Sequence, residues 1–177
     1  MKAIRIHEYG DADTLRLEEI PRLSIEDDQI LVRVQDAGVN PIDWKIRQGY
    51  MKQVMPANFP MTIGQDFAGD VVETGKSARQ FVVGQRVFGF AQGTYAEYVA
   101  APASTIAAIP NSIDFTTAAA LPTAGSTALQ IVRDVGGRKI RHEHPYPRRC
   151  RRGGLMCVAD RQKFGCSGDR YRYGRRH

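Results

Sequence analysis

The first 149 residues contain no cysteine, because the three cysteines are Cys150, Cys157 and Cys166. This absence excludes a disulfide framework, a thiolate nucleophile and a cysteine metal ligand from most of the chain. Histidine is almost as scarce, with His7 alone in residues 1–137. The longest apolar stretches fall well short of the ~18 residues that a membrane span needs. The start, MKAIRIHEYG, lacks the apolar core of a signal peptide, so we expect a cytoplasmic protein with no membrane partner.

Charge divides the chain near Gly137. Residues 1–137 hold 12 Lys or Arg against 16 Asp or Glu, a net charge of −4, whereas residues 138–177 hold 13 against 3, a net charge of +10. The net charge of +6 and the pI near 9.4 are therefore properties of the last forty or so residues. Asymmetry of this kind often marks an arm that binds nucleic acid, which gives a first hypothesis about function.

Short strand patterns fill the first hundred residues. Alternating or β-branched segments bounded by turn residues predict strands at Met1–His7, Gln29–Asp36, Gly69–Glu73, Gln85–Phe90 and Thr94–Ala101. Many short strands at close spacing indicate a small barrel or a sandwich. Asp43–Gly49 is the one segment among them with the composition of a helical turn.

Helical patterns begin after residue 110. Asp114 is a candidate N-cap for a helix over Phe115–Ala120, which we expect to stop at Leu121-Pro122 and to resume over Thr127–Val135. We therefore place one domain at residues 1–110 and the start of a second at residues 111–137. No periodicity survives in residues 138–177, and their composition is typical of disorder.

Five segments together resemble the zinc-free quinone oxidoreductase branch of the medium-chain dehydrogenase/reductase superfamily. They are DAGVNPIDWKIRQG from Asp36, GQDFAGDVVETG from Gly64, VGQRVFGF from Val83, GTYAEYV from Gly93 and AAALPTAGSTAL from Ala118. The resemblance implies a mainly β chain: a GroES-like β-barrel, then the first helices of a truncated Rossmann (α/β) domain, then a disordered basic tail. It also implies NADP(H) as cofactor, a quinone or enone as substrate, and a homo-oligomer for the intact form.

The same resemblance bears on metal binding. Zinc-dependent relatives carry Cys where this chain has Asn40, and a His-Glu pair where it has Gln65-Asp66. Zinc needs three or four N, S or carboxylate ligands converging at ~2.0–2.3 Å, and Asn40 and Gln65 are poor replacements. We therefore expect no metal site.

Two residues resemble positions at the nicotinamide end of the cofactor. Asn40, in GVNPID, either faces the nicotinamide and acts in catalysis, or bonds its own turn before Pro41. Thr123, in PTAG, either approaches the nicotinamide or belongs to a turn that interrupts a helix.

Three further residues follow Asn40. Asp43 either orients Asn40 or caps the helical turn, and the cap is favoured. Trp44 lies beside the substrate or, as favoured here, in the core. Tyr50 resembles an active-site tyrosine that lines the quinone pocket, although an exposed amphipathic tyrosine fits the sequence equally well.

Residues 138–177 lack the glycine-rich turn that the resemblance requires next, where backbone N–H groups and a helix N-terminus hold the pyrophosphate. If the coding DNA is read one nucleotide later, Cys150–Gly154 permits AGGVG and Val158–Gly168 permits LQIAKNLGARV. These are the turn and the helix of a nucleotide-binding βαβ unit. We interpret residues 138–177 as the product of a frameshift near residues 137–140.

Three functions follow from the sequence. The first is an NADPH-dependent quinone, alkene or carbonyl reductase by descent, inactive in this chain. The second is a nucleic-acid-binding protein, because the tail interleaves Arg with Tyr, although the frameshift explains the arginines without selection for a specific nucleic acid. The third is a stand-alone GroES-like binding module.

We predict that limited trypsin digestion removes residues 138–177 rapidly and leaves a protected fragment that contains residues 1–110. The reason is that an arginine-rich segment without apolar periodicity exposes every cleavage site. Mass spectrometry of the fragments over time checks this expectation. A tail that survives as long as the β-rich part contradicts it.

Overall fold

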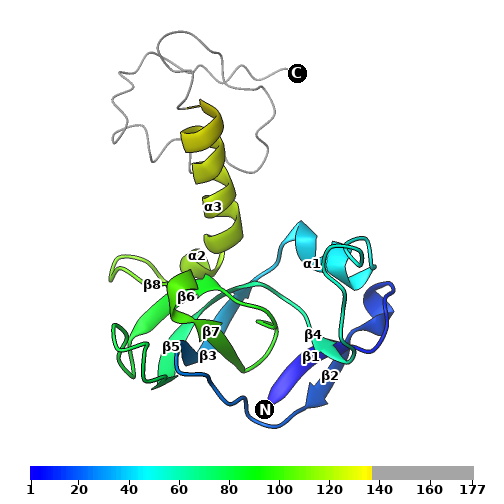
Figure 1. The fold of residues 1–177 in the computed structure, drawn as a ribbon, viewed down its shortest axis with the longest axis horizontal. Coiled ribbons are helices and arrows are strands. Elements are labelled where there is room, and N and C mark those ends of the chain that lie inside the picture. Colours follow the sequence, from blue (N-terminus) through cyan, green and yellow to red (C-terminus); the bar gives the residue numbers. More distant parts are fainter. Residues whose placement is uncertain (137–177) are drawn as a thin grey trace, which may run out of the picture. The chain divides into compact units, whose positions relative to one another are not determined.

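The computed structural model describes residues 1–136 (Figure 1). Its larger sheet has five antiparallel strands in the order β7-β3-β5-β6-β8. Their bounds are β3 Gln29–Gly38, β5 Asp66–Thr74, β6 Arg86–Phe90, β7 Tyr98–Pro102 and β8 Ile106–Ala108. The long strands β3 and β5 lie inside this sheet, so each is hydrogen-bonded along both of its edges.

A second sheet has three antiparallel strands in the order β2-β1-β4. Their bounds are β1 Lys2–Ile6, β2 Arg16–Glu19 and β4 Met61–Thr62. A bridge between Ala3 and Ala96, together with the hydrogen bond from Ile4 N to Tyr95 O, ties β1 to the chain that enters β7.

The main core follows from the residue pattern of the central strands. Every residue from Ile30 to Val32 is fully buried, as is Phe67 on β5, because the strands are covered on both faces. Burying such side chains is the largest favourable contribution to the stability of a fold of this size. The buried residues of this cluster are Ile30, Val32, Phe67, Val71, Ala78, Phe81, Val87, Ala91, Val99 and Ala101.

Three helices complete the described part: α1 Pro41–Arg47, α2 Phe115–Ala119 and α3 Pro122–Gln130, the last continuing as a π-helical turn over Ile131–Gly136. Single 3-10 turns lie at Ala12–Thr14 and Ala103–Thr105. The Asp114 side chain accepts a hydrogen bond from Thr117 N at 2.7 Å, so the predicted N-cap of α2 is confirmed. Ala118 and Ala119 of α2 pack with Ala68 and Ile109 in a second small core.

The structure corrects the predicted elements mainly at their ends. The helix predicted over Asp43–Gly49 begins two residues earlier, at Pro41, because proline fits the first helical position without losing a hydrogen bond. For the same reason Pro122 starts α3, although we expected the helix to resume only at Thr127. The strand predicted over Thr94–Ala101 begins at Tyr98.

The chain divides into two units, Met1–Thr123 and Ala124–His177, and the candidate site lies within the first. The expected domain limits at residues 110 and 137 remain predictions. The expected disorder of residues 138–177 lies outside the described residues. Within residues 1–136, no helix combines the length and apolar character that crossing a bilayer requires.

Candidate functional site

The register of the central sheet brings Asn40 next to Asp66. Gly38, the last residue of β3, pairs with Asp66, the first residue of β5, and Asn40 follows two residues later as the N-cap of α1. The Asn40 side-chain amide Nδ2 donates to Asp66 Oδ2 at 2.9 Å. The pairing of two strands thus fixes a contact between residues 26 positions apart.

Thr123 reaches the same carboxylate from α3. Its backbone N–H donates to Asp66 Oδ2 at 3.0 Å, and its hydroxyl donates to Asp66 Oδ1 at 2.6 Å. The approach depends on Gly38, because a Cβ at that position would collide with Ala119 O and with Asp66 Cβ. Asp66 is 1% exposed and accepts three hydrogen bonds, so it ties β5, the N-cap of α1 and the start of α3 together.

Asp43 forms a second polar centre, on α1. Its Oδ2 accepts hydrogen bonds from Asn40 N at 2.6 Å and from Tyr95 OH at 2.9 Å. The two roles proposed for Asp43 coincide, because the bond that caps the helix also holds the backbone of Asn40. Its other oxygen, Oδ1, is buried and has no hydrogen-bond partner in the described part of the chain.

Burial is the main cause of the shifted pKa values of Asp43 and Tyr95. The pKa of Asp43 is raised, mainly because burial disfavours the charged carboxylate, and the nearby Asp66 adds to the effect. The donors Asn40 N and Tyr95 OH oppose the rise. Burial also raises the pKa of the Tyr95 hydroxyl, with the Asp43 carboxylate as the next cause, so Tyr95 remains a donor.

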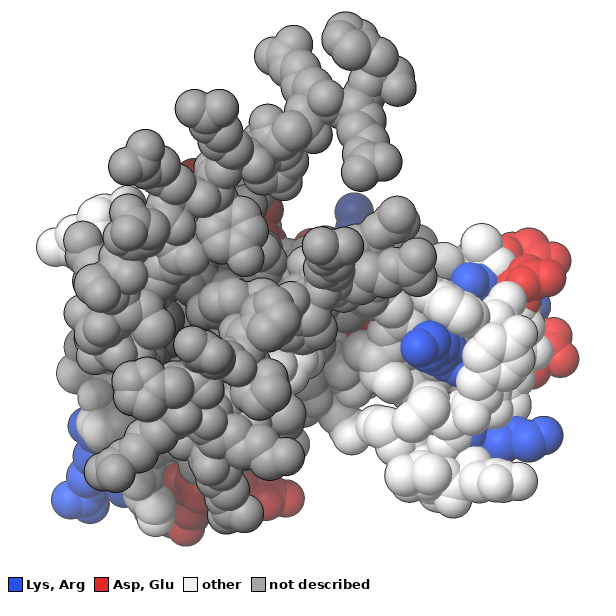
Figure 2. Space-filling model, turned by 90° about the horizontal axis from the view of Figure 1, so that it is seen from above, with Lys and Arg blue, Asp and Glu red and all other residues white. Residues whose placement is uncertain are grey.

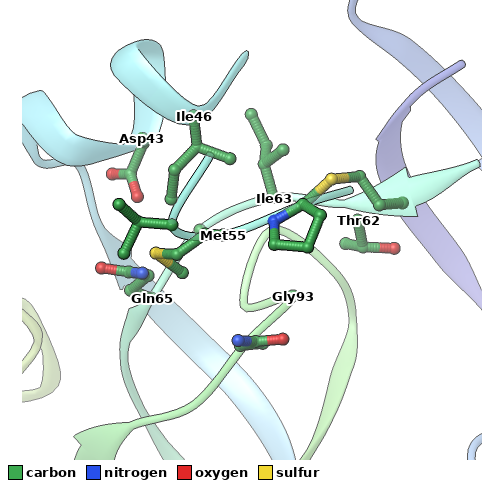
Figure 3. Close-up of a pocket in the computed structure, with 12 residues that line it drawn as sticks. Asp43, Ile46, Met55, Thr62, Ile63, Gln65 and Gly93 are labelled. Carbon is green, nitrogen blue, oxygen red and sulfur yellow. The ribbon is translucent and has the colours of Figure 1, made fainter. Parts of the chain in front are cut away.

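A cavity of about 310 Å³ adjoins Asp43 (Figure 3). Apolar side chains form most of its wall, and Asp43 and Gln65 are its buried polar members. Figure 3 draws both side chains among the residues that line the cavity. The lining residues are Asp43, Ile46, Val54, Met55, Pro56, Met61, Thr62, Ile63, Gly64, Gln65, Gln92 and Gly93.

The structure brings Asn40 and Thr123 together on Asp66 but leaves Tyr50 apart from them. Tyr50 is 68% exposed, is not part of the cavity wall, and packs edge-on against Trp44 with ring centroids 5.7 Å apart. The favoured placement of Trp44 in the core is wrong, because Trp44 is 42% exposed. It lies on the helix face opposite the buried Asp43 and Ile46.

Two contributors to the site escaped sequence analysis. Tyr95 stood in a segment predicted as plain strand, and Gln65 was considered only as a poor substitute for a zinc ligand. The one available signal was Gly64, directly before Gln65: its φ is +94°, and a Cβ there would overlap Thr94 Oγ1 and the Tyr95 ring. A glycine forced by close packing marks where the two segments meet.

Surface charge in the described part is mixed. Figure 2 shows Lys and Arg standing singly beside Asp and Glu, among many uncharged residues, on the part of this face that the grey atoms leave in view. The ion pairs of the described residues also spread over separate elements, for example Arg5 with Glu18 and Arg33 with Asp70. The basic segment behind the nucleic-acid hypothesis lies outside the described residues.

Comparison with known proteins identifies the fold. The sequence model of the alcohol dehydrogenase GroES-like domain matches residues 26–111. A chloroplastic quinone-oxidoreductase homolog of Spinacia oleracea is 33% identical over 145 residues, which cover 79% of this chain and 44% of that protein. The expected mainly β, GroES-like fold is therefore confirmed.

Solved structures support the same fold assignment. The quinone oxidoreductase of Coxiella burnetii matches 77% of this chain and 45% of its own, with a TM-score of 0.73 and 36% identity. The Escherichia coli quinone oxidoreductase, solved in complex with NADPH, matches 76% of this chain and 41% of its own, with a TM-score of 0.71 and 28% identity. The chain thus spans less than half the length of each of these proteins.

We predict that Asp66→Ala lowers the free energy of unfolding by about 2–3 kcal/mol, because it strands three donors on Asn40 and Thr123 without an acceptor. Asp36→Ala is the matched control, since Asp36 also accepts from a threonine, Thr116 at 3.1 Å, but on the exposed surface. The control change should stay within about 0.5 kcal/mol. Urea denaturation of the three proteins measures the difference, and equal effects would contradict a central role for Asp66.

We predict that the purified chain, prepared without a histidine tag, holds no stoichiometric zinc. The described residues contain no group of three or more His, Cys, Asp or Glu side chains placed to hold a metal ion. Asp66, the one carboxylate at a position of the relatives' zinc ligands, is occupied by three hydrogen bonds. Elemental analysis checks the prediction, and one zinc per chain that disappears in Asp66→Ala would overturn it.

Proposed function

Residues 26–111 are an alcohol dehydrogenase GroES-like domain and the chain is a homologue of quinone oxidoreductases, so we propose that it supplies the substrate side of an oxidoreductase. The proposed reaction passes a hydride from NADPH to a quinone or to an activated alkene or carbonyl. The complete protein, proposed to be a homo-oligomer, would place the cofactor between this domain and a Rossmann domain.

The observation that carries the proposal is the triple hydrogen bond at Asp66. The resemblance assigns Asn40 and Thr123 to the nicotinamide, and this role requires the two residues to lie close together although they are far apart in sequence. One buried carboxylate holds both, through Asn40 Nδ2 and through the N–H and hydroxyl of Thr123. A core packing role alone would not require three polar donors to converge on one charge.

These residues fit one end of the cofactor. Bound NADPH would supply the hydride, while Asn40 and Thr123 would face its nicotinamide ring and Asp66 would keep both in place. The pyrophosphate needs glycine N–H groups at a helix N-terminus. Because residues 138–177 offer no such sequence, the fit within this chain is restricted to the nicotinamide end.

The substrate side fits the same proposal. The cavity beside Asp43 is mostly apolar and has a volume of about 310 Å³, within the ~300–1,000 Å³ usual for small-molecule sites. Without zinc, charge that develops on a substrate oxygen has to be stabilised by hydrogen-bond donors. Asn40 and Tyr50 are the proposed donors: the Asn40 amide has a second N–H beside the one that bonds Asp66, and Tyr50 has to turn from its contact with Trp44 to serve. Thr123, the third candidate from the sequence, does not serve in this arrangement, because its N–H and its hydroxyl both donate to Asp66.

We propose further that residues 1–177 turn over little or no substrate, because residues 138–177 are read in the wrong frame. Similarity to the solved quinone oxidoreductases covers 76–77% of this chain, close to the share that precedes Arg138, which supports a change of sequence character at that point. Cys150, Cys157 and Cys166 then have no chemical role.

We predict that this chain binds NADPH weakly or not at all, and that the frame-restored protein binds it and reduces quinones. Arginines without fixed geometry attract phosphates only through interactions that salt screens. Calorimetric titration of both proteins at moderate salt distinguishes them. Tight, salt-insensitive binding by the present chain would refute the frameshift, whereas failure of the restored protein to bind would refute the proposed function.

A further inference from the structure

One wall of the cavity belongs to a segment with few attachments to the rest of the chain. Val54, Met55 and Pro56 line the cavity, and they lie between the end of α1 and the start of β4. Met55 is among the labelled lining side chains of Figure 3. The turn inside this segment is local, because Val54 N and Met55 N both donate to Met51 O. Residues 51–59 are called the wall segment below.

The other walls of the cavity are bonded into the fold. Ile63 O accepts a hydrogen bond from Tyr95 N at 3.0 Å, and Gln65 O accepts one from Ala91 N at 2.9 Å. In contrast, within the described part of the chain no backbone–backbone hydrogen bond joins the wall segment to any residue beyond Gly49. Segments with few such bonds open at a lower free energy than the core of the same protein. The wall segment is therefore the part of the cavity wall that can move without disturbing the sheets.

The Tyr9 side chain holds the middle of the wall segment in place. Its hydroxyl oxygen accepts a hydrogen bond from Ala57 N at 3.1 Å, and its ring meets the Phe59 ring edge-on with centroids 4.9 Å apart. Tyr9 also packs tightly on the other side, because a Cβ at Gly49 would lie 2.9 Å from its ring. Tyr9 therefore connects the wall segment to the turn that follows α1, through one hydrogen bond and one aromatic contact.

The two ends of the wall segment are fixed independently of Tyr9. Before the segment, Tyr50 N donates to Lys45 O of α1 at 2.9 Å. After it, the Arg5 guanidinium donates to Pro60 O, and β4 follows at once, paired with β1. An outward movement of the wall segment therefore has to break the contacts with Tyr9, while the bonds at both of its ends can remain intact.

We propose that the wall segment is a lid on the cavity, closed in the present structure and latched by Tyr9. The contacts that close it are one hydrogen bond, one aromatic pair and the packing of Met55, a set small enough for thermal opening to break. Its exposed side chains include the polar Lys52, Gln53 and Asn58, which stay in water whether the lid is open or closed. The proposal concerns access to the cavity and does not rest on the proposed function.

Thiol labelling of the full chain tests whether the cavity opens without global unfolding. Ile63→Cys places a thiol in the cavity wall at a position that is 4% exposed, and Val32→Cys places one in the main core, away from the cavity. Methyl methanethiosulfonate transfers its CH3S group to a thiolate and releases methanesulfinate, so a mixed disulfide forms. We expect the thiol at position 63 to react at least about tenfold faster than the thiol at position 32, because only the second requires global unfolding. Peptide mass spectrometry separates both positions from Cys150, Cys157 and Cys166.

A second substitution tests the latch. Tyr9→Phe removes the hydroxyl that accepts from Ala57 N and keeps the ring. Combined with Ile63→Cys, it should accelerate labelling at position 63 about fivefold, the factor that corresponds to one ordinary hydrogen bond lost from the closed state. Tyr98→Phe is the matched control, because the Tyr98 ring packs with Arg22 and its hydroxyl has no hydrogen bond among the described residues. The control should leave the labelling rate unchanged.

The lid proposal is overturned if the thiol at position 63 reacts no faster than the thiol at position 32, or if Tyr9→Phe acts like Tyr98→Phe. Should a cysteine variant fail to fold, amide hydrogen exchange of the unaltered chain and of Tyr9→Phe decides instead. Exchange at Met55 should then rise about fivefold in Tyr9→Phe, although its own bond to Met51 O is untouched, and an unchanged rate counts against the lid. Neither measurement uses NADPH or a substrate, so a failure of the lid is distinguishable from a failure of the proposed function.

Discussion

The Asp66 carboxylate is the contact on which the candidate site depends. It joins residues separated by 26 and 57 positions, through one bond from Asn40 and two from Thr123. A buried carboxylate is tolerated only when donors replace its hydration, and here all three come from residues that the fold has to bring together. The site therefore exists only in the folded chain, and a change at any of the three residues is felt by the other two.

Sheet register and one glycine make that convergence possible. Gly38 pairs with Asp66 at the end of the β3–β5 ladder, and any side chain at Gly38 would collide with the end of α2. The missing side chain lets Ala119 pass close to the sheet, so that Thr123, four residues later, meets the carboxylate. The position of the polar site is thus set by backbone packing as well as by the polar residues themselves.

The alternation of apolar and polar residues predicted the long strands, but it did not predict which strands pair with one another. Gln29–Gly38 and the N-cap at Asp114 carry strong local signals, whereas β4, at Met61–Thr62, is a two-residue strand that only its pairing with β1 defines. Asn40 and Thr123 came from family motifs, and their common partner did not, because Asp66 had been weighed as a metal position. Trp44 shows that residue type alone does not predict burial. We expected this tryptophan in the core because it is apolar and follows an apolar strand, yet its position on α1 leaves it exposed.

Asp43 and Asp66 show how one fold gives two carboxylates different chemistry. Asp66 has donors on both oxygens, so its role is to hold Asn40 and Thr123. Asp43 has both donors on one oxygen and none on the other, and burial raises its pKa, so its free oxygen can change between acceptor and donor. Because Asn40 donates its side chain to Asp66 and its backbone N–H to Asp43, it links the two buried carboxyl groups. A change of charge at Asp43 therefore reaches Asn40 directly, through a single hydrogen bond of 2.6 Å.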